Sequence, residues 1–398
     1  MYLTKHEEKM LNGEYGEAKA TAMRLLCALG EIYEAKRLIP VKSCHISGVS
    51  YKTIGDVGLD FLRQMVKEGA SFAVKTTVNP CGIDLEDWEK IGFPNEFAKK
   101  QLEIVDCFRA MGALRSYSCT PYLIGNRPRP GEHVAWSESS AIAYANSILG
   151  ARTNREGGPS ALASAITGKT PYYGLHLPEN RKPTHMVSVK CKVENDLEAS
   201  LLGYTVGKNL GLATPYIGKI RLRQDFLKGL AASMASSSSI SMFYVEGSYE
   251  AKYIGERELK GLEKLEVDDH ALQKTFEELS TQREASTICL GCPHLSLNEL
   301  KRISELATGR RGERKLLCFT SYQTFLKAEK NGLVRRIQKI GGTIVKDTCM
   351  VVSPLTDIGV ESMETNSCKA SYYAPLLSGV KVKLNSLEGI FSQIRGGD

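Results

Sequence analysis

Apolar residues recur along this chain in two alternating patterns: short runs rich in β-branched residues and longer stretches with helical spacing. The pattern is clearest in the C-terminal third, where it predicts strands over 287–290, 316–319 and 343–345 and helices over 297–307 and 322–340. Strands that alternate with helices in this way are typical of a parallel sheet with right-handed crossovers. The pattern therefore predicts an α/β fold.

The N-terminal part repeats this alternation less regularly. It predicts helices over 16–36, 55–68 and 139–149, followed by a loop over 150–183 that is rich in Gly, Pro and Asn. Four short runs in this part predict strands, at 38–45, 71–76, 113–118 and 133–136. The α/β scheme therefore extends to the first half of the chain.

A further α/β unit follows the loop and begins with an alternating strand predicted over 185–193. The serine run at 236–239 leads directly into a predicted strand over 240–245, which indicates a turn rather than a linker. A chain of 398 residues usually forms two or three domains. We therefore divide it into an N-terminal, a middle and a C-terminal α/β domain, at residues 1–183, 184–282 and 283–398.

The composition is that of an ordinary globular protein with a mild basic excess. Lys and Arg number 52 against 45 Asp and Glu, a formal net charge of +7. This excess suits an anionic substrate, but it is too dispersed to indicate nucleic-acid binding. No basic-then-apolar segment opens the chain, and no apolar run approaches the roughly 18 residues of a membrane span. We therefore expect a cytoplasmic protein.

Three of the eleven cysteines occupy related positions. Cys119, Cys292 and Cys349 each stand just after a predicted strand ends. Ligands of α/β proteins collect beyond the carboxyl ends of the strands, so these distant thiols are expected to converge. An odd number of cysteines without an export signal favours reduced thiols over disulfides. Three thiol ligands would leave one metal position open for chemistry.

Thiolates are soft ligands, and three of them without a nearby histidine pair favour an iron–sulfur cluster over zinc. Cys289 forms a CxxC pair with Cys292 and competes with Cys349 as a ligand, although its place inside a predicted strand favours simple burial. The residues alone leave two alternatives open: buried structural cysteines, or a nucleophilic Cys119 or Cys292 working with His294.

Polar and small residues near other strand ends are candidates for substrate contacts. The small-residue loop of Gly48, Val49 and Ser50 would let backbone N–H groups approach an anion, or is simply a tight turn. Asn79 would donate to a carboxylate or hydroxyl, whereas Asn-Pro with Pro80 also forms turns readily. These residues are candidates for substrate contacts only if the cysteines converge nearby.

Glu138 and Ser139 open a predicted helix, where both residue types are also good helix caps. Lys369 is a candidate partner for a carboxylate or phosphate group. His45 and His294 adjoin these segments, and each is either a hydrogen-bonding partner of the site or a satisfied core histidine.

Three motifs centre on the cysteines: Ser-Cys-Thr-Pro-Tyr at 118–122, Gly-Cys-Pro-His at 291–294 and Asp-Thr-Cys-Met-Val at 347–351. Together with further segments, they resemble the aconitase X family over nearly the whole chain, in particular its archaeal-type large subunits. The further segments lie at 44–51, 75–80, 136–140, 150–157 and 366–369.

The resemblance implies an aconitase-like fold of two to three α/β/α subdomains around a cluster site, without the family's swivelling domain. It implies a [4Fe–4S] cluster with one free iron, isolated in some cases as [3Fe–4S]. Its ligands would be Cys119, Cys292 and Cys349, with Cys349 preferred to Cys289 because its motif matches the family. Activity would then require a small subunit that carries the swivelling domain and a serine base.

The activity implied by the resemblance is removal of water from (R)-5-phosphomevalonate to give trans-anhydromevalonate 5-phosphate, a step of archaeal-type isoprenoid synthesis. Glu138 and Ser139 would be catalytic, with Glu138 helping to protonate the departing hydroxyl. The substrate-binding residues would be Gly48, Val49, Ser50, Asn79, Pro80 and Lys369.

Two other functions remain alternatives. Within the same family, a cis-3-hydroxy-L-proline dehydratase is usually one longer chain with the swivelling domain fused to it. From another class, an iron-sensing relative would bind RNA after losing its cluster, but the chain lacks a basic tract interleaved with aromatic residues.

Overall fold

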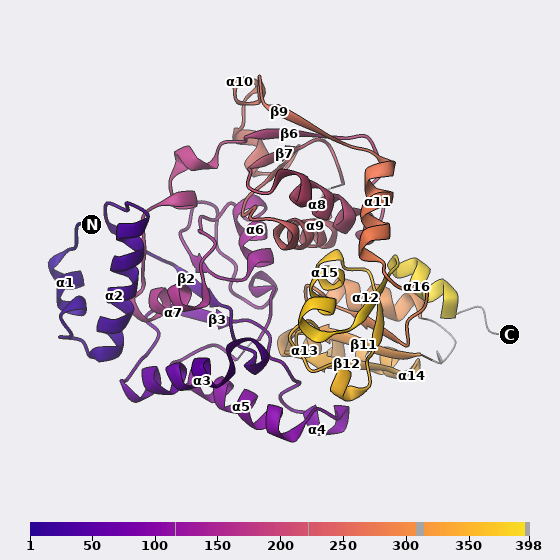
Figure 1. The fold of residues 1–398 in the computed structure, drawn as a ribbon, viewed down its shortest axis with the longest axis horizontal. Helices are drawn as coiled ribbons and strands as arrows, with labels where there is room; N and C mark the ends of the chain where they lie inside the picture. Colours follow the sequence, from indigo (N-terminus) through magenta and orange to yellow (C-terminus); the bar gives the residue numbers. More distant parts are fainter. Residues whose placement is uncertain (116, 222, 308–313, 395–398) are drawn as a thin grey trace.

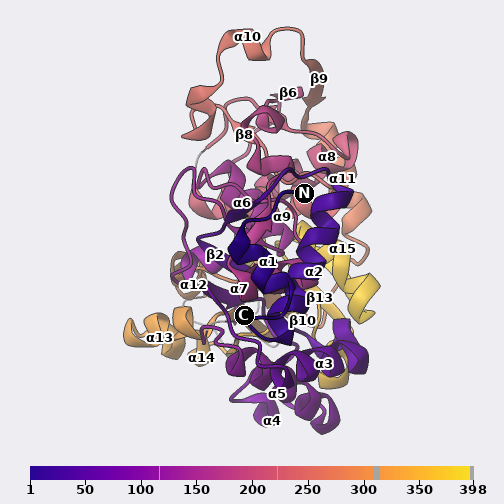
Figure 2. The same ribbon diagram turned by 90° about the vertical axis from the view of Figure 1, so that its left-hand side faces the viewer.

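Three parallel sheets, each covered by helices, follow one another along the chain (Figures 1 and 2). The computed structural model describes residues 1–115, 117–221, 223–307 and 314–394. In Figure 1 the middle part lies at the top, the C-terminal part at the right, and the N-terminal part at the left and bottom. The α/β class predicted from the sequence is confirmed.

The N-terminal part contains a three-stranded parallel sheet in the order β3-β2-β4 and a separate antiparallel pair, β1 with β5. Its strands are β1 (Leu38–Pro40), β2 (Ser43–Ile46), β3 (Lys75–Val78), β4 (Ala135–Trp136) and β5 (Lys169–Pro171). Its helices are α1 (Lys5–Leu11), α2 (Glu17–Ile32), α3 (Tyr51–Lys67), α4 (Trp88–Ile91), α5 (Asn95–Ala110), α6 (Ser139–Ser147) and α7 (Gly158–Thr167).

The middle part contains a four-stranded parallel sheet in the order β8-β7-β6-β9. Its strands are β6 (His185–Val189), β7 (Pro215–Ile217), β8 (Tyr244–Val245) and β9 (Glu263–Val267), and its helices are α8 (Asp196–Leu210), α9 (Gln224–Ser237), α10 (Glu256–Leu259) and α11 (Asp269–Leu279). Helix α6 of the N-terminal part packs against α9, so the two parts share one apolar core (Figure 1).

The C-terminal part contains a five-stranded parallel sheet in the order β12-β11-β10-β13-β14. Its strands are β10 (Thr287–Leu290), β11 (Lys315–Thr320), β12 (Gly342–Lys346), β13 (Ser362–Thr365) and β14 (Lys381–Leu384). Its helices are α12 (Leu297–Leu306), α13 (Tyr322–Lys330), α14 (Leu333–Lys339), α15 (Cys368–Ser378) and α16 (Leu387–Ile394).

Several predicted elements differ from the structure for local reasons. The strand predicted over 38–45 is two strands in different sheets: residues 38–40 pair with β5, whereas residues 43–46 pair with β3 and β4. The helix predicted over 322–340 is broken at Gly332, which adopts a left-handed φ of 69°. The loop predicted over 150–183 contains α7 and β5; the Pro at the start of α7 and the Gly after it are favourable helix boundaries.

Other predicted strands are shorter or shifted. The strand expected over 71–76 lies at β3, and that over 240–245 is reduced to β8. Residue 116 lies outside the described residues, and Tyr117 of the strand expected over 113–118 forms a single bridge with Val78. Within the described ranges, no helix combines the length and apolar character that a bilayer crossing requires.

Candidate functional site

A cavity of about 180 Å³ lies where strand ends of the N-terminal and C-terminal sheets meet. Asn79 and Pro80 follow β3, and Glu138 and Ser139 follow β4. The two sheets are joined beside the cavity by a bridge between Cys81 and Thr348, the residue before Cys349. The end of each strand therefore brings polar side chains into one space, as expected for parallel sheets.

The three cysteines singled out by the sequence all line this cavity. Cys119 comes from the N-terminal part, whereas Cys292 and Cys349 follow β10 and β12. Burial raises the pKa of each thiol, that of Cys292 to about 12, and the positive charge of Lys369 opposes this effect. The free thiols are therefore protonated at neutral pH, and a bound metal would displace their protons.

A buried ion pair lies on another wall of the cavity. Lys369 on α15 bonds to Glu138 and lies 3.3 Å from Ser140 Oγ. Burial raises the pKa of Glu138, but the charge and hydrogen bond of Lys369, with further hydrogen bonds from Asn79 and Ser140, lower it to about 2. Burial lowers the pKa of Lys369, and Glu138 and the thiols raise it above its usual value. The pair is therefore fully ionised.

A chain of hydrogen bonds leads from this pair into the N-terminal sheet. Asn79 Nδ2 donates to Glu138 Oε2 at 2.7 Å, and His45 Nε2 lies 2.9 Å from Asn79 Oδ1. His45 Nδ1 in turn lies 2.9 Å from Thr77 Oγ1. His45 is fully buried, and burial lowers its pKa to about 4. It is a neutral ring that fixes the orientation of the Asn79 amide.

Not every predicted site residue reaches the cavity. Gly48, Val49 and Ser50 do not line it; Ser50 Oγ donates to the carbonyl of Val352, a wall residue, at 2.8 Å. Cys289 is fully buried in the apolar core of the C-terminal part and does not line the cavity either.

The wall also contains four residues that the sequence did not single out as site residues: Val351, Val352, Tyr373 and Leu377. For Tyr373 a signal existed, because it lies four residues after Lys369 and hence on the same face of a helix. Val351 and Val352 follow Cys349 in a turn, and their burial depends on the packing of α15, which local sequence does not reveal.

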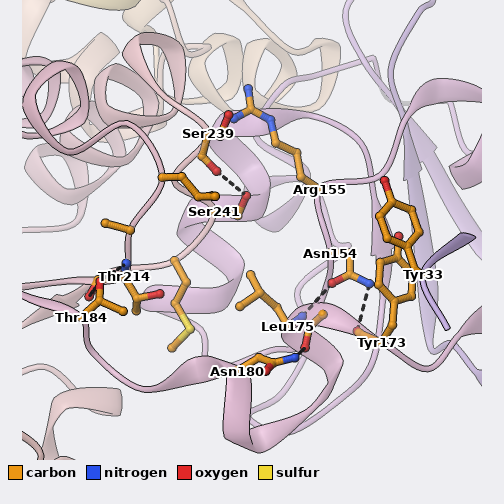
Figure 3. A pocket seen from close by; sticks show the side chains of 14 residues that line it. Tyr33, Asn154, Arg155, Tyr173, Leu175, Asn180, Thr184, Thr214, Ser239 and Ser241 are labelled. Atoms are coloured by element: carbon orange, nitrogen blue, oxygen red, sulfur yellow. Dashed lines mark hydrogen bonds between the residues drawn. The ribbon is translucent and has the colours of Figure 1, made fainter. Parts of the chain in front are cut away.

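A second, larger cavity of about 520 Å³ lies between the N-terminal and middle parts (Figure 3). Its lining includes Tyr33, Tyr173 and Arg155, the last from the Gly-rich segment at 150–157. The Arg155 guanidinium donates to the carbonyls of Ala235 and Ser238 at the end of α9, at 3.2 and 2.8 Å. Arg155 therefore stabilises a helix end.

The side chains that line the smaller cavity can be compared with the ligands that a metal centre requires. Among the described residues, no three His, Cys, Asp or Glu side chains stand close enough to hold a single metal ion. A cubic iron–sulfur cluster binds each thiolate through a different iron, so its ligands stand further apart than those of one ion. Three soft thiols around one cavity fit such a cluster better than a mononuclear zinc site.

An α/β fold with three cysteines around one cavity defines a class of protein, and comparisons identify it. The chain belongs to the aconitase X family. Models described as the first, second and third domains of aconitase X match residues 1–179, 183–277 and 285–395. The crystal structure of Thermococcus kodakaraensis aconitase X in its holo-form has a TM-score of 0.92 at 44% identity, covering 99% of this chain and 100% of that one.

The chain is similar to particular enzymes over its full length. The phosphomevalonate dehydratase large subunit of Methanocaldococcus jannaschii is 45% identical, with 98% of each chain covered. That of Thermococcus kodakarensis is also 45% identical, with 99% of this chain and 100% of the relative covered. The cis-3-hydroxy-L-proline dehydratase of Pseudomonas aeruginosa is 33% identical over 98% of this chain, which covers 69% of that longer protein.

Proposed function

We propose that this chain is the large subunit of a hydro-lyase that removes water from (R)-5-phosphomevalonate to give trans-anhydromevalonate 5-phosphate. The observation that carries the proposal is one cavity lined by three thiols and a buried Lys369–Glu138 pair, in a chain 45% identical to phosphomevalonate dehydratase large subunits. This places it in an archaeal-type mevalonate route to isoprenoids.

In this proposal Cys119, Cys292 and Cys349 hold a [4Fe–4S] cluster. Cys349 is preferred to Cys289 because it lines the cavity, whereas Cys289 lies in the apolar core. When bound, the cluster would supply Lewis acidity toward a substrate hydroxyl at the iron that no cysteine holds.

Lys369 and Asn79 provide the donors that bind the anionic substrate. Both side chains donate to Glu138, and Lys369 also donates to Ser140 Oγ. At least one N–H on Asn79 Nδ2 and one on Lys369 Nζ therefore stay available for a ligand. Because its pKa is about 2, Glu138 is ionised at neutral pH. In this proposal Glu138 keeps Lys369 charged and oriented. The resemblance implies that it also helps to protonate the departing hydroxyl, a role that its ionised state does not favour.

Ser139 lies in the first turn of α6. It lines the cavity beside Glu138, which caps the same helix by accepting from Ser140 N. The two residues reach the cavity together because the helix begins where β4 ends. We assign Ser139 to orientation of the substrate through its hydroxyl.

Elimination also requires a base next to the substrate carboxylate. Glu138, the cavity's only carboxylate among the described residues, is occupied by Lys369. We assign the base, a serine, to a small partner subunit with a swivelling domain. Two facts support a partner: the relatives are named large subunits, and this chain covers only 69% of the longer cis-3-hydroxy-L-proline dehydratase of Pseudomonas aeruginosa.

A reducing compartment suits this proposal. All eleven cysteines are free thiols, and the cluster needs three of them unoxidised. Disulfide bonds are rare in the cytoplasm, where thiols are kept reduced. We therefore assign the enzyme to the cytoplasm.

The test is anaerobic reconstitution of the chain with iron and sulfide, followed by mixing with its small subunit and assay of two substrates. We expect water loss from (R)-5-phosphomevalonate only with both subunits present. Preference for cis-3-hydroxy-L-proline would transfer the assignment to the other branch of the family. Full turnover by the isolated chain would refute the assignment of the base to a partner.

A further inference from the structure

His294 belongs to the Cys292 loop and contacts the loops that carry Cys119 and Cys349. It is 1% exposed, and all of its polar atoms have partners. Its backbone N–H donates to Cys119 Sγ at 3.2 Å, and its ring nitrogens lie 3.1 Å from Ser118 Oγ (Nδ1) and 2.8 Å from the Thr348 carbonyl oxygen (Nε2). One residue therefore touches the segments of Cys119 and Cys349, and lies two positions after Cys292.

The partners determine the tautomer of the ring. A carbonyl oxygen only accepts hydrogen bonds, so Nε2 carries the proton that it donates to Thr348. In the neutral ring Nδ1 is then an acceptor, and Ser118 Oγ donates to it. A protonated ring would place two donors against these groups and lose the Ser118 donation. The neutral Nε2–H form thus connects both loops.

The middle part of the molecule holds His294 from the opposite side. Lys228 on α9 donates to the His294 carbonyl at 2.9 Å and forms an ion pair with Glu299. Asp225, also on α9, accepts from Ser296 Oγ at 2.9 Å. Lys228 is 3% exposed, so its contact with His294 is shielded from solvent. All three parts of the chain therefore meet at His294.

We propose that His294 is a positioning residue that holds the three cysteine loops at the spacing required by the cluster. The inference rests on the proposed cluster, because His294 would act on it through the cysteine loops. It goes further in naming which residue sets the geometry: the hydrogen bonds to Ser118 and Thr348 orient the residues directly before two of the ligands. Such outer partners typically contribute about 10- to 100-fold to metal affinity.

Substitutions with side chains of different length separate the contributions of the two ring contacts. The amide of Gln in His294→Gln stands near the position of Nε2 and preserves the donor to Thr348, whereas that of Asn in His294→Asn stands near Nδ1 and preserves the contact with Ser118. His294→Ala removes both contacts. The matched control is His176→Ala, which removes another fully buried histidine that is bonded to His133 and does not line the cysteine cavity.

The readouts are iron and sulfide per chain after anaerobic reconstitution, the electron paramagnetic resonance spectrum, the rate of cluster loss to a chelator, and the unfolding free energy of the cluster-free chain. We expect His294→Ala to bind the cluster about 10- to 100-fold more weakly. His294→Gln and His294→Asn should fall between it and wild type, with altered spectra. His176→Ala should lose stability but keep wild-type affinity and spectrum.

Wild-type affinity and spectrum in His294→Ala would overturn the inference and leave the proposed function standing. An equal loss in His176→Ala at equal stability would also overturn it, because the effect would then be general destabilisation. A wild-type chain that takes up no cluster would overturn the proposed function, and this inference with it.

Discussion

Glu138 at the start of α6 and Lys369 on α15 form an ion pair that joins the N-terminal and C-terminal parts of the molecule across the cysteine cavity. The side chains are each 12% exposed, so solvent screens the pair only weakly. Neither charge would be tolerated there alone, because an uncompensated buried charge is costly. The pair therefore links one wall of the cavity to the packing of the two parts.

Lys369→Met should destabilise the cluster-free chain by about 3–5 kcal/mol, the usual cost of removing one member of a buried pair. The double variant Glu138→Gln/Lys369→Met should recover part of this loss, because no unpaired charge remains. Urea unfolding at neutral pH measures both. A single-variant loss of less than about 1 kcal/mol, as for an exposed pair, would contradict this account.

Stability should depend on pH through His45. Its folded-state pKa is about 4, so it binds a proton only below that pH, whereas the unfolded chain binds one below about 6.5. The neutral ring therefore contributes stability above about pH 6.5 that is lost as the pH falls toward 4. The stability advantage of wild type over His45→Gln should shrink by about 2 kcal/mol between pH 7 and pH 5.

Urea unfolding of both chains at the two pH values checks this prediction. His45→Gln lacks the titrating ring but keeps a donor near the position of Nε2, so the comparison isolates the proton. A pH-independent difference would show that His45 does not titrate as its burial requires.

The choice between two cysteines is directly testable. Cys349→Ala should abolish cluster binding, because it removes a thiol of the cavity, whereas Cys289→Ala should retain it and lose only packing in the core of the C-terminal part. Iron and sulfide content after reconstitution, with electron paramagnetic resonance, measures both. A cluster that survives Cys349→Ala but not Cys289→Ala would reverse the assignment.

Gly291, the residue before Cys292, should tolerate no side chain. Its φ is +117°, and an added Cβ would lie 2.2 Å from the Phe319 carbonyl oxygen. Gly291→Ala should therefore shift the Cys292 loop, weaken cluster binding and destabilise the chain by more than the roughly 1–3 kcal/mol of backbone strain alone.

The control is Gly332→Ala, where φ is +69° and nothing lies within 4 Å of the added Cβ. It should cost only the roughly 1–2 kcal/mol of a left-handed residue and leave cluster binding unchanged. Equal effects of the two substitutions on cluster content would contradict a special role for Gly291.

The sequence predicted best where neighbouring residues decide the structure. Strands β10, β11 and β12 and helix α12 lie where the apolar pattern predicted them, because each element reflects the spacing of its own apolar residues. The break at Gly332 was missed because the helical pattern continues on both sides of it. Helix α7 was missed because its flanking glycines and prolines resemble those of a loop.

By itself the sequence determined the α/β class and the position of two thiols, Cys292 and Cys349, after strand ends, since both follow from local periodicity. The strand predicted before Cys119 is reduced to a single bridge at Tyr117. The tertiary structure decided which groups face one another: Cys349 rather than Cys289 at the cavity, Lys369 beside Glu138, and His294 against the loops of Cys119 and Cys349. These relationships depend on how three sheets pack. Packing depends on contacts between residues far apart in the chain, and the local spacing of apolar residues does not predict those contacts.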